Sequence, residues 1–309
     1  MLQHKHLLGL EGYPSKDIQT IIDTAFGFRK VLERPIKKVP SLQGKTVVNL
    51  FFEMSTRTRI SFELAQKRMS ADTVSFSAAS SSLNKGESFK DTVQNIEAMK
   101  IDAVILRHPA SGAPQHLTKF VDAIVINAGD GMHEHPTQAI LDMMSLQEQF
   151  NNLEGLKVGI IGDISHSRVA LSNIFGLTTM GADVMICGPS TLMPPHIEKL
   201  GVKVSYDMDE VVDWADAVNI LRIQLERMGT GLYPSIREYR ELFGLSVERI
   251  KRHSKDLVVM HPGPMNRGTE IDSAVADSDR AIILDQVLNG VASRMAILYL
   301  LLGGKMEEN

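Results

Sequence analysis

The amino-acid sequence predicts an α/β protein with two doubly wound lobes, each a parallel sheet covered by helices on both faces. Apolar runs of strand length alternate with segments whose apolar residues recur at helical spacing, and a polar turn at residues 151–155 divides them into two series. The chain also has 309 residues, which is long for one compact α/β lobe. Ligands of such sheets bind beyond the carboxyl ends of the strands, so we expect the active site in the cleft between the lobes.

The first series opens with a helix in YPSKDIQTIIDTAFGFRKVLE, for which Ser15 is the expected N-cap. The run KTVVNLFF then has the length and composition of a buried strand, and helices alternate with strands after it. The strands of this series are predicted at 45–52, 72–77, 102–107 and 123–129, and its later helices at 60–69, 88–99, 113–120 and 137–150.

The second series has the same alternation and ends in a strongly apolar helix, DQVLNGVASRMAILYLLLGG, which we expect to pack back on the first lobe. We predict domains at 1–150 and 151–288, followed by the returning helix at 289–309. Strands of the second series are predicted at 157–163, 183–189, 203–206, 217–222 and 256–264, and helices at 167–181, 194–201 and 208–215.

Composition narrows the class of protein. The net charge is −4 and the pI about 6.2, without a basic tail, so nucleic acid is not an expected partner. Cys187 is the only cysteine, which excludes an intramolecular disulfide or a thiolate metal cluster and fits a reducing cytosol. No apolar run reaches the length of about 18 residues that a membrane span needs, and the N-terminus lacks a signal-peptide pattern. We expect a cytoplasmic protein.

The stretch Ser55-Thr56-Arg57-Thr58 lies between a predicted buried strand and a helix. At a helix N-terminus, free backbone N–H groups and the helix dipole favour an anion. The hydroxyls add donors, and a guanidinium adds a planar fork that matches phosphate oxygens. A single Ser-Thr pair would usually be a helix cap, but four donors with an arginine predict a phosphate site. It is not a P-loop, because no GxxxxGK[ST] pattern occurs.

Two further strand ends of the first lobe carry polar side chains. Arg107 follows DAVIL directly, and HEHPTQ follows AIVINAG. A lone arginine or histidine there is usually structural, but these strand ends should face the same side as the phosphate site. His135 then offers a proton donor and Gln138 an amide beside a bound anion. His133 and His135 lack a third ligand at sensible spacing, so we expect no metal.

The second lobe carries cations at similar places. Arg168 follows GIIGDISHS, and LRIQLER places Arg222 and Gln224 at the end of AVNI. Arginines there indicate a second anionic substrate, such as a dicarboxylate. The loop HPGPMNRG, residues 261–268, follows a strand and is rigid enough to present backbone carbonyls to a ligand N–H group.

The sequence has no recognisable Ser-His-Asp or Cys-His pattern and no cofactor motif. Its inventory of arginine, lysine, histidine, hydroxyl and amide groups can bind two anions and stabilise charge on a carbonyl oxygen. The polar loop SSSLNKGES, residues 80–88, can be assigned no chemistry from local spacing.

Together these motifs resemble the catalytic chains of the aspartate carbamoyltransferases over essentially the whole length. The Ser-Thr-Arg-Thr-Arg and His-Pro-x-Gln motifs belong to all carbamoyltransferases, so they indicate only the superfamily. The second lobe indicates the acceptor, because ornithine carbamoyltransferases carry His-Cys-Leu-Pro where this chain has His-Pro-Gly-Pro. Met54 departs from the proline or alanine more common in the family, and we expect it to affect loop stiffness rather than donor count. In order, the shared motifs are STRTR after FFE, SSSLNKGE, LRHP, HPTQ, HSRVA, LRIQLER and HPGPMNRG.

The resemblance implies a carbamoyl-phosphate-binding domain at 1–150, an aspartate-binding domain at 151–288, and transfer of a carbamoyl group to L-aspartate in pyrimidine biosynthesis, without a cofactor. It implies a homotrimer with shared active sites, to which Ser81 and Lys85 of a neighbouring subunit contribute. Attachment of regulatory chains or of a dihydroorotase is left open. By this resemblance, the phosphate is bound by Ser55, Thr56, Arg57 and Thr58, and the carbonyl oxygen accepts from Thr58, Arg107 and His135. The carbamoyl NH₂ is bound by Gln138 and by the loop at Pro262, Gly263 and Pro264. The aspartate carboxylates are bound by Arg168, Arg222 and Gln224.

Two other readings stay open from the sequence. One is a carbamoyltransferase for another amine, such as ornithine. The other is a non-catalytic subunit that keeps the fold, although such relatives typically lose the arginines or the histidine that this chain keeps as Arg57, Arg107 and His135.

Overall fold

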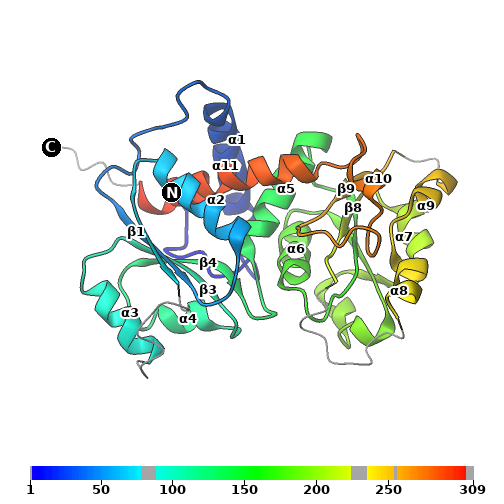
Figure 1. The fold of residues 1–309 in the computed structure, drawn as a ribbon, viewed down its shortest axis with the longest axis horizontal. Coiled ribbons are helices and arrows are strands. Elements are labelled where there is room, and N and C mark those ends of the chain that lie inside the picture. Colours follow the sequence, from blue (N-terminus) through cyan, green and yellow to red (C-terminus); the bar gives the residue numbers. More distant parts are fainter. Residues whose placement is uncertain (1, 78–87, 224–234, 254–255, 304–309) are drawn as a thin grey trace. The chain divides into compact units, whose positions relative to one another are not determined.

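The computed structural model describes residues 2–77, 88–223, 235–253 and 256–303. The chain divides into two compact units, residues 1–144 with 288–309 (unit 1) and residues 145–287 (unit 2). Each unit is built on its own parallel sheet (Figure 1). The predicted fold class is therefore confirmed, while the limits of the functional domains at 150/151 and 288/289 remain a proposal.

The sheet of unit 1 has the strand order β2-β1-β3-β4, and its neighbouring strands pair in parallel. All four strands lie within one residue of their predicted positions. Three of them are short apolar runs bounded by polar residues, and the fourth, DTVSFS, alternates polar and apolar residues. Beyond β4, Leu7 forms a parallel bridge to Ile126, which the sequence did not indicate. The strands are β1 (Thr46–Phe51), β2 (Asp72–Ser77), β3 (Ala103–His108) and β4 (Ile124–Asp130).

Helices cover both faces of this sheet, with α3 and α4 on one side and α1, α2 and α11 on the other (Figure 1). The predicted start of the second helix at Ile60 was wrong, because α2 begins at Thr56. Pro14 rather than Ser15 holds the N-cap position of α1. The helices are α1 (Ser15–Leu32), α2 (Thr56–Arg68), α3 (Phe89–Glu97), α4 (Ala113–Leu117), α5 (Pro136–Phe150) and α11 (Ile283–Leu302).

The helix α2 is fastened to β1 by a buried pair of amides. Asn49 Nδ2 donates to Gln66 Oε1 over 3.0 Å, and Gln66 Nε2 donates back to Asn49 Oδ1 over 2.8 Å. Both side chains are fully buried, so each amide supplies the partner that the other needs. This pairing fixes the position of the β1–α2 connection, where the phosphate site is predicted.

The returning helix α11 packs on unit 1, as predicted. Arg29 Nε of α1 donates to Asn289 Oδ1 over 3.0 Å, and the ring of Phe28 meets that of Tyr299 edge to face at 5.7 Å. Within the described residues, no helix has both the length and the apolar character that crossing a membrane would require.

Unit 2 has the strand order β7-β6-β5-β8-β9, again parallel. The predicted helix at 194–201 is a short 3₁₀ helix, and three helices between 236 and 276 were missed. Two of them are only six and four residues long, but Ile236, Tyr239 and Phe243 of the third have helical spacing that could have indicated it. The elements are β5 (Lys157–Ile161), α6 (Arg168–Thr179), β6 (Asp183–Cys187), η3 (Ser190–Leu192), η4 (Ile197–Leu200), β7 (Lys203–Ser205), α7 (Met208–Trp214), β8 (Ala217–Ile220), α8 (Ile236–Phe243), α9 (Val247–Arg252), β9 (Val258–Met260) and α10 (Ser273–Ala276).

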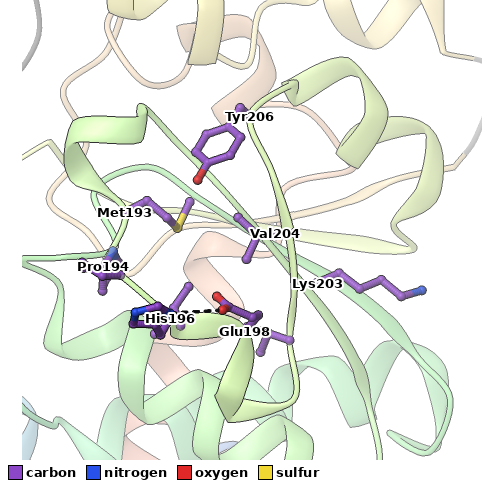
Figure 2. A pocket seen from close by; sticks show the side chains of 10 residues that line it. Met193, Pro194, His196, Glu198, Lys203, Val204 and Tyr206 are labelled. Carbon is purple, nitrogen blue, oxygen red and sulfur yellow. Dashed lines mark ion pairs between the residues drawn. The ribbon is translucent and has the colours of Figure 1, made fainter.

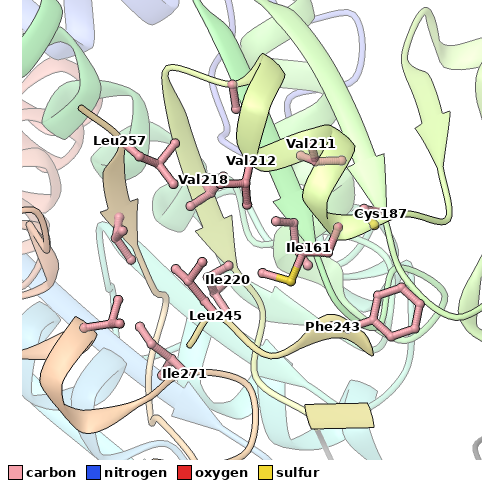
Figure 3. Packing of buried hydrophobic residues seen from close by; sticks show 14 of the residues in the cluster. Ile161, Cys187, Val211, Val212, Val218, Ile220, Phe243, Leu245, Leu257 and Ile271 are labelled. Carbon is pink, nitrogen blue, oxygen red and sulfur yellow. The ribbon is translucent and has the colours of Figure 1, made fainter. Parts of the chain in front are cut away.

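The core of unit 2 gathers apolar side chains of the sheet and of α7 and α8, including Ile161, Val211 and Phe243 (Figure 3). Cys187 lies fully buried in this cluster, and burial raises the pKa of its thiol to about 12. A thiol with that pKa stays protonated near neutral pH, so Cys187 serves packing and not nucleophilic chemistry.

Candidate functional site

Three neighbouring strands of unit 1 end at the residues predicted to bind an anion. The strand β1 leads into the stretch 55–58, β3 ends with Arg107 and His108, and β4 leads to His135. The register pairs Phe51 with Arg107 across β1 and β3. Because parallel strands end at the same edge of a sheet, the structure brings these three segments to one edge.

The stretch after β1 forms the N-terminus of α2. Ser55 is the N-cap, with an extended φ of −158°, and its hydroxyl is not used to cap the helix. Thr56, Arg57 and Thr58 are the first helical residues, and the first turn contains no acidic residue. Ser55 and Thr58 are half-buried, while Thr56 and Arg57 are exposed. The N–H groups of this turn and the helix dipole make the segment suited to an anion.

Arg107 is held between two neighbouring strands. Its Nη1 donates to the carbonyl of Ala128 on β4 over 3.2 Å, and its Nε lies 3.3 Å from Glu53 Oε2. The side chains of Arg107 and Glu53 are only 13% and 16% exposed. No role was predicted for Glu53 from the sequence, although its position two residues before the predicted phosphate site was a signal. The pair places a guanidinium at the edge of the sheet.

His135 and Gln138 lie at the start of α5. His135 is buried and precedes Pro136, the first residue of the helix, and its Nδ1 lies 3.4 Å from Thr137 Oγ1. The Gln138 side chain donates from Nε2 to Asp142 Oδ1 over 2.9 Å. Because the amide nitrogen faces Asp142, the oxygen of the Gln138 amide is directed away from it. Helical spacing of four residues could have indicated Asp142 as a partner of Gln138.

Glu134, which precedes His135, forms hydrogen bonds with the N-terminal segment of the chain. Its Oε2 accepts from the Leu10 N–H over 2.8 Å, and its Oε1 accepts from the Glu11 N–H over 3.2 Å. The carboxylate is buried. Sequence analysis missed Glu134, because its partners are more than a hundred positions away and no local spacing connects them.

His133 pairs with a carboxylate. Its Nδ1 lies 3.2 Å from Asp130 Oδ2, and Asp130 also accepts from the Gly112 N–H and from Asn127 Nδ2. Burial raises the pKa of Asp130, but hydrogen bonds from His133, Gly112 and Asn127 together hold it below its ordinary value. The hydrogen bond to Asp130 likewise raises the pKa of His133. No group of three His, Cys, Asp or Glu side chains that could hold a metal ion occurs among the described residues.

The predicted site residues of unit 2 also follow neighbouring strands. Arg168 begins α6 after β5, Arg222 follows β8, and the loop from His261 follows β9. Arg168 is buried, and its helix is capped by Ser167 Oγ, which accepts from the Ala170 N–H over 3.2 Å. These three segments therefore lie at one edge of the second sheet.

Hydrogen bonds hold the loop at Pro262–Pro264 on both its N-terminal and its C-terminal side. His261 Nδ1 accepts from the Gly263 N–H over 2.8 Å, and its Nε2 lies 3.2 Å from Glu270 Oε1. Farther along, Asn266 Nδ2 donates to the carbonyl of Ile223 over 3.0 Å, next to Arg222. Gly263 has a φ of 63°, and the Gly263–Pro264 peptide is cis. The loop and the Arg222 segment are thus held together.

Three residues predicted for the site, Ser81, Lys85 and Gln224, lie outside the described residues.

A pocket of about 590 Å³ in unit 2 is lined by η4 and β7 and their neighbouring loops (Figure 2). Met193, His196 and Tyr206 line it, and His196 Nδ1 lies 3.7 Å from Glu198 Oε1. None of the residues predicted for the site lines this pocket.

Comparisons with known proteins cover both units. Residues 5–148 match the family model of the aspartate/ornithine carbamoyltransferase carbamoyl-P binding domain, and residues 154–301 match that of the Asp/Orn binding domain. The aspartate carbamoyltransferase catalytic subunit of Cytophaga hutchinsonii is 57% identical over 98% of this chain and 99% of its own length.

Solved structures of two kinds are similar to the chain. Aspartate transcarbamoylase from Trypanosoma cruzi, in complex with carbamoyl phosphate and aspartate, has a TM-score of 0.86 and 28% identity over 96% of this chain and 97% of its own. Ornithine carbamoyltransferase from Pyrococcus furiosus has a TM-score of 0.85 and 28% identity over 97% of each chain. The backbone alone therefore does not separate the two acceptors.

Proposed function

The chain belongs to the aspartate/ornithine carbamoyltransferase family, and we propose that it transfers the carbamoyl group of carbamoyl phosphate to the amino group of L-aspartate, giving N-carbamoyl-L-aspartate and phosphate. One observation carries the choice of acceptor, namely 57% identity to an aspartate carbamoyltransferase catalytic subunit along almost the whole of both chains. The reaction would serve pyrimidine biosynthesis.

The phosphate of carbamoyl phosphate is bound at the start of α2 in this proposal. Ser55, Thr56 and Thr58 supply hydroxyl and backbone donors, and Arg57 supplies a guanidinium. The support for this assignment is the exposed helix N-terminus without an acidic residue in its first turn. The product phosphate would be held by the same donors.

The carbamoyl group lies toward the ends of β3 and β4. Thr58, Arg107 and His135 donate to its carbonyl oxygen, and Gln138 Oε1 accepts from its NH₂ together with the backbone carbonyls at Pro262–Pro264. The orientation of Gln138 supports this role, because its Nε2 is already bonded to Asp142. Each donor to a developing oxyanion contributes about 2.7–4 kcal/mol toward lowering the barrier.

Aspartate is bound by unit 2 in this scheme. Its carboxylates pair with Arg168, Arg222 and Gln224, since a guanidinium can hold a carboxylate through two parallel hydrogen bonds. The fastening of the Arg222 segment by Asn266 supports a fixed position for that guanidinium.

In this scheme, transfer of the carbamoyl group needs no nucleophile from the protein. The aspartate nitrogen attacks the carbamoyl carbon, a N–C bond forms, and the C–O bond to phosphate breaks as the tetrahedral intermediate collapses. The amine proton leaves with the phosphate. Holding the two substrates in register supplies much of the acceleration.

We also propose the assembly that the resemblance implies. The chain forms a homotrimer in the cytoplasm, and Ser81 and Lys85 of one subunit enter the site of its neighbour. Both residues lie outside the described part of the chain, so this proposal rests on the motif SSSLNKGE alone. Measurement of the mass in solution tests it.

Ornithine is the second candidate acceptor, because the Pyrococcus furiosus ornithine enzyme is as similar in backbone as the aspartate enzyme. Steady-state rates of phosphate release from carbamoyl phosphate, with aspartate or ornithine as the acceptor, separate them. We expect release to depend on aspartate and ornithine to give only the background rate. Faster release with ornithine would overturn the assignment.

A further inference from the structure

The loop between β4 and α5 is held at Glu134 through its backbone. The Glu134 N–H donates to Asp130 Oδ1 over 3.1 Å, and the Glu134 carbonyl accepts from the Asp130 N–H over 3.1 Å. Both residues are buried, and Asp130 Oδ1 also accepts from Asn127 Nδ2 over 2.8 Å. The backbone is therefore fixed immediately before His135, whose carbonyl accepts from the Gln138 N–H at the start of α5 over 2.9 Å.

The side chain of Glu134 is held by a different part of the chain. Its Oε2 accepts from the Leu10 N–H over 2.8 Å and its Oε1 from the Glu11 N–H over 3.2 Å, so each oxygen has a backbone donor. Two accepting oxygens are what an ionised carboxylate offers. Because Glu134 is only 1% exposed, these two N–H groups take the place that water would have at a surface.

The N-terminal segment, residues 6–11, is fixed to the sheet. The Leu7 N–H donates to the Val125 carbonyl of β4 over 3.0 Å, and the Leu7 carbonyl accepts from the Asn127 N–H over 2.8 Å. Leu7 and Leu10 are fully buried. The backbone donors that meet the carboxylate are thus anchored to the strand that precedes the loop.

Gly9 leaves the space that the carboxylate occupies. A Cβ on Gly9 would lie 2.9 Å from Glu134 Cδ and closer still to Oε1, too near for atoms that are not bonded. The atoms that it would meet belong to the end of a flexible side chain and not to the backbone. A methyl group on residue 9 would therefore displace the carboxylate, while the backbone around it can stay in place.

Resting on the proposed function, we propose that Glu134 is a positioning residue for His135: the N-terminal segment holds the Glu134 carboxylate, and this contact keeps the His135 imidazole directed at the carbamoyl oxygen. In this role Glu134 touches no substrate. Its action runs through the peptide that joins residues 134 and 135. It concerns the oxygen of the carbamoyl group and not the phosphate, which is bound at the start of α2.

Gly9→Ala tests this role without changing Glu134 or His135. The kcat should fall on the order of tenfold, because a donor to a developing oxyanion contributes about 10²–10³ in rate and does so only at the right distance. The Ki of inorganic phosphate, which has no carbamoyl group, should stay within about twofold of wild type. Gly27→Ala on α1 is the matched control and should leave kcat unchanged, since a Cβ there would meet no neighbouring side chain within 4 Å.

A double-mutant cycle separates positioning from general support of the fold. In a His135→Ala background, Gly9→Ala should lower the residual kcat by less than about twofold, since the group through which it acts is already absent. Glu134→Ala should lower kcat at least as much as Gly9→Ala does, and it should make Gly9→Ala neutral because the methyl group then has room. Glu134→Gln, which keeps one accepting oxygen, should retain more activity than Glu134→Ala.

An equal loss of kcat from Gly9→Ala in the wild-type and His135→Ala backgrounds would assign the contact to general support and overturn the proposal. An unchanged kcat in folded Gly9→Ala, or a rise of the phosphate Ki as large as the loss of kcat, would overturn it as well. If Gly9→Ala does not fold, Glu134→Gln takes its place in the same cycle, with the same readings. Failure of the proposed function looks different, since the wild-type chain itself would then transfer no carbamoyl group.

Discussion

The guanidinium of Arg107 lies 3.3 Å, through Nε, from the carboxylate of Glu53, and both side chains are largely removed from solvent. The two residues sit at the ends of the neighbouring strands β3 and β1, where the backbone N–H of Phe52 also donates to the Arg107 carbonyl over 2.9 Å. A carboxylate thus sets the direction of a guanidinium assigned to the carbamoyl oxygen.

Glu53→Gln should lower kcat/KM by at least about tenfold, because breaking a partly buried ion pair leaves Arg107 without its orienting charge. Steady-state kinetics with both substrates measure the effect. Glu33→Gln is the control: Glu33 forms an exposed pair with Arg29 on α1, and its loss should leave the rate unchanged. Equal effects of the two variants would contradict the role of Glu53.

Arg57→Ala should reduce kcat by roughly 10²–10³ or more while the protein stays folded, because a donor to the transition state is lost from an exposed position. Arg59→Ala is the matched control, since Arg59 is exposed on the same helix and lies 3.9 Å from Glu63. Near-normal kcat in folded Arg57→Ala would remove Arg57 from the phosphate site.

Arg222→Ala should raise the KM for aspartate far more than the KM for carbamoyl phosphate, since it removes a carboxylate partner in unit 2. Arg240→Ala, which breaks the exposed pair of Arg240 with Asp272, is the control and should change neither constant. If Arg222→Ala moved both constants equally, Arg222 would be structural or shared between the substrates.

Loss of His133 should destabilise the protein more at low than at high pH. The pKa of His133 is raised above 6.5, chiefly by its hydrogen bond to Asp130, with smaller contributions from Glu134 and Glu11. Its stabilisation is therefore complete below the unfolded value and is lost as pH rises through the folded value. Asp130 has a lowered pKa and stays ionised throughout this range.

The variant His133→Gln should accordingly lower Tm more at about pH 5.5 than at about pH 8.5, and thermal melts at the two values check this. His116→Gln, on the short helix α4, is the control for replacing a histidine in unit 1. The same loss of Tm at both pH values would show that the charge of His133 does not contribute.

Complementation tests the shared site. Lys85→Ala and Arg107→Ala homotrimers should each be nearly inactive. In a closed ring with head-to-tail contacts, each mixed trimer contains one interface that pairs both intact halves, so activity should reappear at roughly a third of the wild-type level per mixed trimer. Mixtures that stay inactive, while wild type survives the same treatment, would place the whole site within one chain.

Much of the fold was readable from the sequence because most of the strands are short apolar runs. The strand at 72–77 was predicted to the residue, and its polar and apolar residues alternate from Thr73 to Ser77. The start of α2 was placed four residues late, because Thr56-Arg57-Thr58 carries no apolar periodicity from which a helix could be inferred. The predicted phosphate-binding residues and the missed helical turn are therefore the same part of the chain.

The residues that support the site were harder to predict from the sequence. The buried Glu134 carboxylate accepts from the Leu10 and Glu11 N–H groups, and only the folded chain brings these residues together. Local spacing could have suggested Asp142, four residues after Gln138 on a predicted helix. The motifs predict the groups that touch substrate, whereas a contact such as that of Glu134 with Leu10 joins distant parts of the chain.

The central claim is that the carbamoyl carbon of carbamoyl phosphate ends on the nitrogen of aspartate. Its most direct test follows ¹³C-labelled carbamoyl phosphate by NMR with the purified chain and L-aspartate, using Arg57→Ala prepared in the same way to exclude a contaminating enzyme. We predict that the label appears in N-carbamoyl-L-aspartate in equal amount to the phosphate released. Phosphate release without labelled carbamoyl-aspartate, or labelled product only with ornithine, would contradict the account.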